Sequence, residues 1–183
     1  MGVQRKGILM KNRFVPGLIV GIVVTLLVLA AGAYIYFAQG FAPVATSAAP
    51  MPFEKTLARL GLHGALSREK LKTPPIEASE TNLLDGAMVY QDQCAVCHGL
   101  PGGSKTPIAQ GMFPPPPQLF HGKGVTDDPP GETYWKVANG IRLTGMPGFA
   151  KSLKDDQLWH VTLLLAHADS LPASVTNALA AER

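Results

Sequence analysis

The residues of this chain that point most directly to a chemistry are Cys94, Cys97 and His98. They stand in the sequence Cys-Ala-Val-Cys-His, and the chain contains no other cysteine. This C-x-x-C-H spacing is typical of covalent haem attachment, in which two thiols one helical turn apart form thioether bonds to the porphyrin and the next residue binds the iron. We therefore predict one haem c, bound through Cys94 and Cys97, with His98 as the proximal axial ligand.

Two other uses of a cysteine pair fit the sequence less well. A thioredoxin-like redox pair requires a surrounding βαβ pattern, which the sequence does not show. A structural zinc site requires four ligands, usually including a second Cys or His pair at short spacing, and no such pair follows. A single C-x-x-C-H and the absence of an internal repeat predict one haem.

The sixth ligand of the iron is predicted to be Met146. It lies in the sequence Thr-Gly-Met-Pro-Gly-Phe, where glycines let the backbone pass close to a porphyrin and Pro147 stiffens the loop. Met112 follows His98 by 14 residues, so reaching the opposite haem face from there is awkward. A histidine ligand or an open site is the alternative, and the histidines concerned, all expected at the surface, are His121, His160 and His167.

Charge is distributed unevenly along the chain. Four basic residues precede residue 14 without an acidic one, whereas the remainder has 12 basic and 13 acidic residues. The basic four are Arg5, Lys6, Lys11 and Arg13. A basic tail on a neutral-to-acidic body is not typical of a nucleic-acid-binding protein, so we expect no nucleic-acid partner. The 19 Gly and 16 Pro favour long loops over a sheet.

Residues 14–38 are uncharged and almost wholly apolar, long enough to cross a hydrocarbon core of about 30 Å. We predict one transmembrane helix there, in contact with the lipid bilayer. The preceding basic residues place the N-terminus in the cytoplasm and everything after Gly40 outside, with an aromatic belt of Tyr34, Tyr36, Phe37 and Phe41. The alternative is a cleaved signal peptide, although its apolar core spans only about 7–15 residues.

We expect five parts along the chain. They are a cytoplasmic basic tail (1–13), the transmembrane helix (14–38), an extracytoplasmic linker with short helices (39–80), a haem domain (81–169) and a C-terminal tail (170–183). In the linker, Phe53, Leu57 and Leu60 share one face of a short helix. This helix either docks on a partner or the membrane surface, or packs on its own domain.

Three helices are predicted in the haem domain, at 81–94, 132–138 and 155–168. The first starts at Thr81 or Asn82, both suitable N-caps. It carries Gly86 and Tyr90 on the stripe that ends at Cys94, and a glycine there lets another helix approach closely. A long Gly/Pro loop connects the first helix to the second.

The chain resembles class I c-type cytochromes, more narrowly the single-haem domains of cbb3-type oxidase subunit III and of many bacterial dehydrogenase-linked cytochromes. The matching segments are Gly86-x-x-x-Tyr90-x-x-x-Cys94-x-x-Cys97-His98-Gly99, Asn139-Gly140-Ile141, Gly145-Met146-Pro147 and Leu158-Trp159. The resemblance covers about residues 81–169. It implies an all-α cytochrome c fold, three to five helices around one covalent haem, with the first and last helices crossing near Gly86, Tyr90 and Trp159.

An iron held by His98 and Met146 is six-coordinate, which is typical of an electron carrier rather than an enzyme. We predict a membrane-anchored monohaem cytochrome that transfers single electrons between partners of a respiratory or photosynthetic chain. Its partners are then membrane-bound redox complexes or other electron-transfer proteins, with no small-molecule substrate. We expect it on the periplasmic side of a bacterial inner membrane, single-pass.

The alternatives to a free carrier are a cytochrome subunit built into a larger oxidoreductase complex and, less consistent with Met146, a haem enzyme or gas sensor with a displaceable sixth ligand. A far-red absorption band of the oxidised protein separates the carrier from the last two. Arg142 and Lys105 are candidate contacts for the haem propionates, with solvated loop charges as the alternative.

Overall fold

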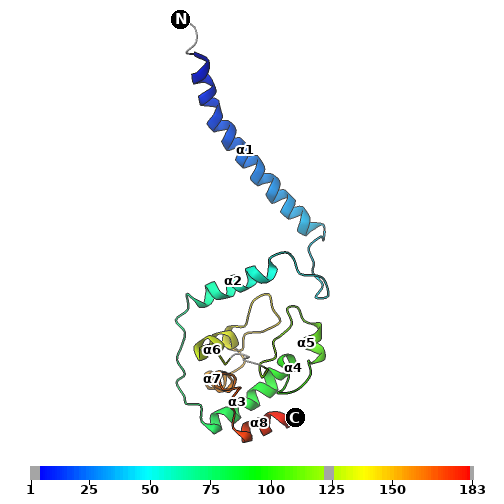
Figure 1. Cartoon of the computed structure of the whole chain (residues 1–183), viewed down its shortest axis with the longest axis vertical. Coiled ribbons are helices and arrows are strands. Elements are labelled where there is room, and N and C mark those ends of the chain that lie inside the picture. Colours follow the sequence, from blue (N-terminus) through cyan, green and yellow to red (C-terminus); the bar gives the residue numbers. More distant parts are fainter. Residues whose placement is uncertain (1–4, 122–125, 182–183) are drawn as a thin grey trace. The chain divides into compact units, whose positions relative to one another are not determined.

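The computed structural model describes residues 5–121 and 126–181, with side chains from Phe14 onward. Residues 1–4 and the side chains of the basic tail lie outside this described part. The chain divides into two compact units, Met1–Met51 and Pro52–Arg183. All regular elements within the described residues are helices (Figure 1), which confirms the predicted all-α class.

The first unit is built on α1, Arg5–Ala38. Its residues Phe14–Ala38 have a mean hydropathy of 2.7 and are long enough to span a membrane, and their side chains are exposed throughout. This range coincides with the predicted transmembrane helix. A helix whose side chains are exposed over Phe14–Ala38 suits a lipid environment, where its backbone groups are satisfied within the helix.

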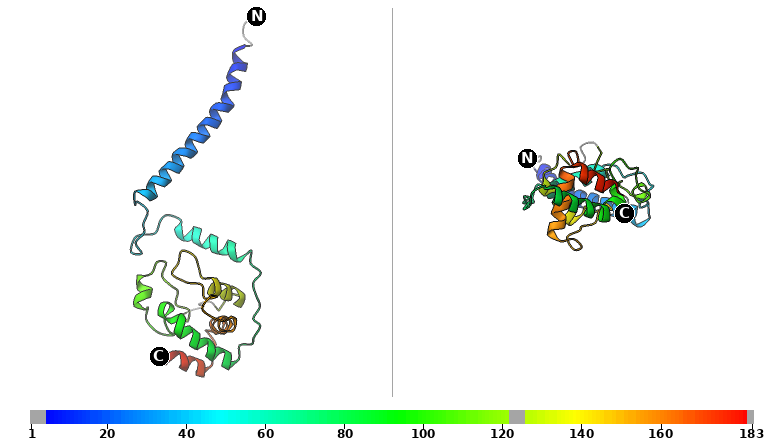
Figure 2. Two further views of the ribbon diagram at one scale, coloured as in Figure 1. Left: turned by 180° about the vertical axis from the view of Figure 1, so that it is seen from behind. Right: turned by 90° about the horizontal axis from the view of Figure 1, so that it is seen from below.

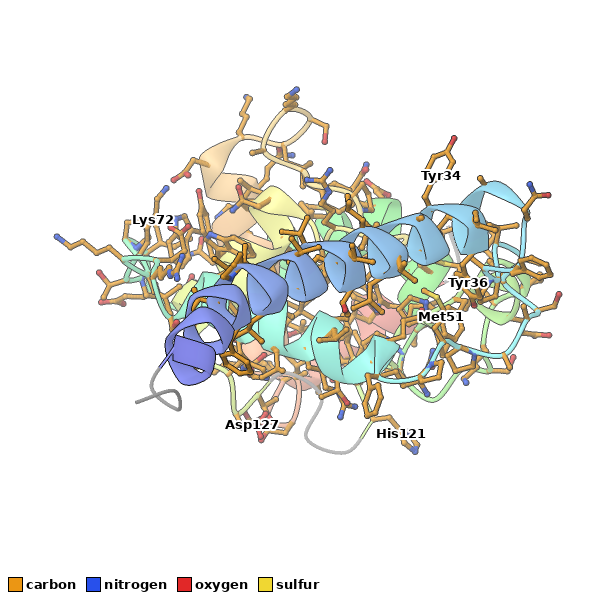
Figure 3. The ribbon with its side chains drawn as sticks, turned by 90° about the horizontal axis from the view of Figure 1, so that it is seen from above. Tyr34, Tyr36, Met51, Lys72, His121 and Asp127 are labelled. Atoms are coloured by element: carbon orange, nitrogen blue, oxygen red, sulfur yellow. The ribbon has the colours of Figure 1, made fainter. Side chains whose placement is uncertain are left out.

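The helix ends at a glycine in the left-handed region. Gly40 has φ +75°, and its N–H donates to Phe37 O while Phe41 N–H donates to Tyr36 O, which is a Schellman motif. The turn stacks the Phe41 ring on Tyr36 at a centroid distance of 6.4 Å. Tyr34 and Tyr36 project from this end of α1 (Figure 3), where the sequence predicts an aromatic belt.

The second unit begins with α2, Glu54–Leu66, a longer helix than the one predicted from Phe53 to Leu60. Leu66 is buried and Leu62 half-buried, whereas Phe53, Leu57 and Leu60 are exposed. The apolar face named in the sequence is therefore not the face that packs on the domain.

After α2 the chain crosses the domain in an extended segment, residues 67–79, which we call the strap. Its backbone lies against the first turn of α6, because a Cβ at Gly131 would come within 2.2 Å of Lys72 O. Lys72 Nζ donates to Tyr134 Oη (3.0 Å) and lies 3.6 Å from Asp155 Oδ1. Tyr134 also donates to Asp155 and stacks on Trp159 at 4.3 Å.

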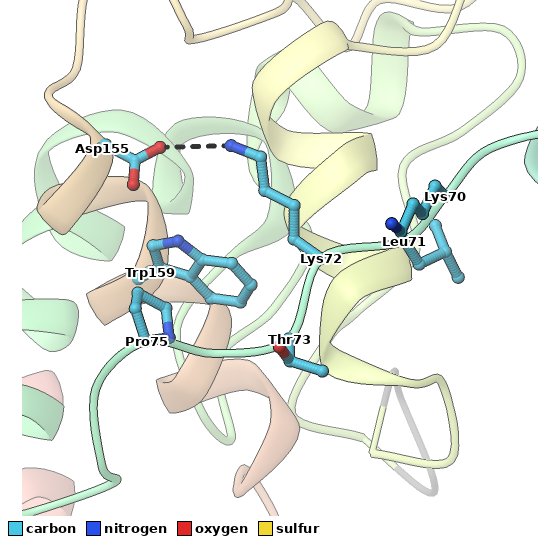
Figure 4. A pocket seen from close by; sticks show the side chains of 7 residues that line it. All are labelled: Lys70, Leu71, Lys72, Thr73, Pro75, Asp155 and Trp159. Carbon is cyan, nitrogen blue, oxygen red and sulfur yellow. Dashed lines mark ion pairs between the residues drawn. The ribbon is translucent and has the colours of Figure 1, made fainter.

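This network shifts the pKa values of Lys72 and Asp155. The Tyr134 hydroxyl holds the pKa of the Asp155 carboxyl below its usual range, and the hydrogen bond to Tyr134 raises the pKa of Lys72. The strap and the start of α7 line a pocket of about 450 Å³ (Figure 4). None of the predicted haem ligands lines it, and we read it as part of the packing of the strap.

The core of the domain is formed by α3 (Glu80–Gln93), α6 (Pro130–Asn139), α7 (Asp155–Ala166) and α8 (Ala173–Ala180). α7 packs against both α3 and α6 and is buried nearly all round, so its apolar surface is wider than the predicted stripe. The cap of α3 is Ser79, whose Oγ accepts from Asn82 N–H. The N-caps predicted at Thr81 and Asn82 were therefore wrong by two or three residues.

The segment treated as a C-terminal tail contains α8, which lies beside α3 (Figure 1, Figure 2). Val175 and Leu179 of α8 are fully buried. Gln91 on α3 fixes the end of α8, because its amide donates to Ala178 O at 2.9 Å and Ala181 O at 3.0 Å. The core therefore includes the chain almost to its end.

The predicted close approach at Gly86 is confirmed. A Cβ at Gly86 would lie 2.3 Å from His160 O and 3.0 Å from Leu164 Cβ. The backbones of α3 and α7 therefore touch at this point.

Gly86→Ala should destabilise the domain by about 3 kcal/mol, since added volume in a close-packed crossing costs about 1–3 kcal/mol or more and here it meets backbone. Urea denaturation followed by helical circular dichroism measures the loss. Gly61→Ala is the control: nothing lies within 4 Å of a Cβ there, and the change should stay within about 1 kcal/mol. Equal effects of the two substitutions would contradict the described crossing.

Candidate haem site

The two thiols lie where α3 gives way to α4, Ala95–His98. Cys94 is the C-cap of α3 and its N–H donates to Tyr90 O (2.8 Å). His98 N–H then donates to Cys94 O (2.9 Å), so one turn of helix separates the first thiol from the imidazole. Both cysteines are free and half-buried, with Cys94 packed against the apolar core.

The surroundings of Cys94 keep its thiol protonated. Burial, followed by the neighbouring Cys97, raises the pKa of Cys94 to about 12. A protonated thiol is a poor nucleophile toward disulfides, so this environment does not activate Cys94 for thiol exchange.

The imidazole of His98 is oriented by the loop that follows. His98 Nδ1 lies 2.8 Å from Pro117 O; since a carbonyl only accepts, Nδ1 carries the proton and Nε2 keeps its lone pair. Burial lowers the pKa of His98, against a smaller opposing effect of the Pro117 hydrogen bond. The ring is thus held as a neutral ligand with one defined nitrogen available.

The backbone around His98 is fixed by two further side chains. Gln118 Nε2 donates to His98 O at 2.8 Å, and the buried Tyr90 hydroxyl donates to Gly99 O at 2.7 Å. Gly99 has φ +75°, and a Cβ there would lie 3.1 Å from the Gln118 amide. The turn after the histidine therefore requires glycine both for its conformation and for space.

Met146 lies in a loop that closes on itself between α6 and α7. Ile141 N–H donates to Met146 O (3.2 Å), and the Thr144 hydroxyl accepts from Met146 N–H (3.1 Å). At the base of the loop a Cβ on Gly140 would meet Gly148 N at 2.5 Å. The methionine side chain is half-buried and packs against the same apolar core as Cys94.

Met112, which the sequence analysis considered awkwardly placed to reach the opposite haem face, contacts the Met146 loop. It is the C-cap of α5, Pro107–Gly111, a helix that packs on α4 and is joined to it by a hydrogen bond from Thr106 Oγ1 to Val96 O (2.6 Å). A Cβ on Gly145 would lie 2.0 Å from Met112 Cε and 3.5 Å from its sulfur. A second thioether therefore sits against the residue that precedes Met146.

The other sequence candidates are placed as follows. His121 is exposed and lines a small pocket on the His98 side with Gln118 and Phe120, and it projects from the opposite side of the domain to Lys72 (Figure 3). His160 and His167 are half-buried rather than fully exposed, and His167 Nδ1 lies 2.9 Å from Leu163 O. Arg142 and Lys105 are exposed.

The donor set fits a c-type haem. The fit consists of two free thiols one turn apart, a neutral imidazole with Nε2 available, and a thioether loop packed on the same apolar core. Half-buried apolar side chains, Leu100, Phe120, Phe149 and Leu153, pack around that core. Within the described residues no cluster of three or more His, Cys, Asp or Glu suits a bare metal ion.

An all-helical domain with these features is a c-type cytochrome domain. Residues 81–164 match the family described as cytochrome C oxidase, cbb3-type, subunit III. This part of the chain is therefore a cytochrome c domain of the cbb3 subunit III kind, and such domains bind haem iron and transport electrons. The strap, α2 and α8 lie outside the matched residues.

Comparison with solved structures and with curated proteins does not narrow the assignment further. One solved structure, from the Kuenenia stuttgartiensis reducing HAO-like protein complex Kustc0457/Kustc0458, is 26% identical with a TM-score of 0.47. The similarity covers 57% of this chain and 53% of that chain, so it spans about half of each. No curated protein matches the chain.

Several parts of the site were missed by the sequence analysis. The Thr106-Pro107 pair, a capping residue followed by proline at the first helical position, is a local signal for α5. Pro117 and Gln118 offered no such signal, because their roles depend on where the loop returns to His98.

Tyr90→Phe should lower the stability of the domain by about 1–3 kcal/mol, because it leaves the buried Gly99 carbonyl without a donor. Urea denaturation of the haem-loaded protein measures the loss. Tyr34→Phe, an exposed tyrosine on α1, is the control and should have no measurable effect. A Tyr90→Phe protein as stable as the control would show that the hydroxyl does not support the turn.

Gly145→Ala should shift the far-red absorption band of the oxidised protein, because the new methyl group displaces Met112, and should lower stability by less than about 1 kcal/mol, since the displaced atom ends a flexible side chain. Met112→Ala in the same chain should restore most of both properties by making room. Gly111→Ala, with nothing within 4 Å of the new Cβ, is the control. If the double variant is no better than Gly145→Ala alone, the contact with Met112 is not what makes glycine necessary.

Proposed function

We propose that this protein is a membrane-anchored monohaem c-type cytochrome that transfers single electrons between redox partners of a respiratory or photosynthetic chain. The observation that carries the proposal is the C-x-x-C-H turn, in which Pro117 occupies Nδ1 of His98 and leaves Nε2 for the iron. Haem, when bound, supplies a one-electron iron couple.

In this proposal Cys94 and Cys97 would hold the haem covalently, and His98 and Met146 would bind its iron. The neutral thioether of Met146 favours the ferrous state relative to a second imidazole. The apolar side chains around Cys94 and Met146 favour it further, because they exclude water from the metal. With both axial positions filled by the protein, small molecules have no open site, and the protein acts as a carrier rather than an enzyme.

The location is proposed from the N-terminal sequence. Basic residues precede the apolar span of α1 and none follows it before Lys55. The N-terminus is then cytoplasmic and the haem domain lies on the periplasmic face of an inner membrane. The partners are membrane-bound redox complexes or other electron-transfer proteins that meet the domain there.

The test begins with the purified full-length protein, whose mass should exceed that of the polypeptide by one haem. Met146→Leu should abolish the far-red band of the oxidised form, lower the reduction potential and allow carbon monoxide to bind the reduced form. Met88→Leu, a substitution at an exposed methionine on α3, is the control and should leave all three unchanged.

Two results would contradict the proposal. A polypeptide without added mass has no covalent haem. A wild-type protein that binds carbon monoxide as readily as the Met146→Leu variant has an open or weakly filled sixth site, which is typical of a haem enzyme or gas sensor.

A further inference from the structure

Helix α2 has two apolar faces, and the domain covers one of them. Leu62 and Leu66 lie on the side that packs, half-buried and buried. Phe53, the N-cap residue in the left-handed region, precedes the helix, and Leu57 and Leu60 share its opposite side. They are 77%, 65% and 64% exposed, with no cover from the described residues.

The helix has little to stabilise it apart from that contact. It has only 13 residues, and its N-cap residue makes no side-chain capping bond. Gly61 and Gly64 lie inside it with nothing within 4 Å of a Cβ at either position, and a glycine in a helix interior costs about 1 kcal/mol relative to alanine. Since a short helix is marginal in water without a packed apolar face, an external surface that accepts the outer face would stabilise α2.

Charge indicates the nature of that surface. Residues 53–71 contain four basic and two acidic residues, whereas residues 73–183 contain seven basic and eleven acidic ones. An anionic surface therefore attracts the segment around α2 and repels the rest of the domain. Anionic headgroups of a bilayer attract basic segments in this way.

Continuity with the membrane span identifies the bilayer as the occupant. Phe53 follows the last residue of α1 by 15 positions, so α2 stays close to the membrane in which α1 is anchored. A short flexible connection converts a weak surface affinity into a high effective concentration.

We propose that α2 lies in the headgroup region of that bilayer, with Phe53, Leu57 and Leu60 inserted among the lipids and the net positive charge of residues 53–71 favouring anionic headgroups. This is the geometry of an interfacial amphipathic helix. It rests on the proposed membrane anchoring, and it gives the haem domain a defined face toward the membrane.

The test uses the full-length haem-loaded protein in vesicles with anionic lipid. Because thioether bonds engage Cys94 and Cys97, a Leu57→Cys variant has a single reactive thiol for an environment-sensitive fluorophore. Ala58→Cys is the matched control, since the next residue is also exposed but points about 100° away around the helix.

We expect blue-shifted emission from the Leu57→Cys label and several-fold stronger quenching by a lipid-borne nitroxide than at Ala58→Cys. The difference should shrink in zwitterionic vesicles. Equal quenching of both labels by an aqueous quencher would overturn the proposal. A blue shift that increases with the density of protein in the vesicle but is not quenched by the nitroxide lipid would also overturn the proposal, because a second copy of the chain would then cover residue 57.

Two readouts separate this proposal from the proposed function. Flotation with the vesicles after an alkaline wash reports the anchor, and the absorption spectrum reports the haem. A coloured protein that floats while the Leu57→Cys label stays in water refutes the docking of α2 alone. A protein that fails to float refutes the anchoring as well.

Discussion

The contact between the backbones of α3 and α7 at Gly86 is the constraint on which the site depends. The end of α3 carries Cys94, and α7 follows directly on the loop that carries Met146. Because no side chain separates the two helices at their crossing, each has little freedom to slide along the other. A fixed crossing therefore fixes two segments that lie more than fifty residues apart in the sequence, and α8 holds α3 from a further side.

Glycines recur where the loops around the site come close to other groups. Gly99, Gly140 and Gly145 each lie where a Cβ would meet another group, respectively Gln118, the returning loop backbone and Met112. Close backbone approach makes the loops short and rigid, and rigid loops lose little entropy when a ligand side chain is fixed. The apolar core supplies the energy, while the glycines determine how near the polar and sulfur-bearing groups come to one another.

The sequence predicted the parts that depend on local patterns. The C-x-x-C-H motif and the apolar span follow from residues within a few turns of one another, whereas the all-α fold and the crossing near Gly86 were implied by the resemblance to class I c-type cytochromes. The partners of His98, the contact of Met112 with Gly145 and the position of the strap depend on where distant segments return, and no local pattern encodes that. The start of α3 was misplaced because Ser79 was overlooked in favour of later polar residues.

The strap changes how far the haem domain can travel. Of the residues between the end of α1 and the start of α3, those from Glu54 onward belong to α2 or lie along the domain. Only about fifteen residues are left as a connection between α1 and the domain, with a contour length of roughly 50 Å at about 3.3–3.6 Å per residue. Under the proposed anchoring of α1, this connection keeps the domain within that distance of its point of insertion, and its electron donors and acceptors then have to present their redox centres within the same range.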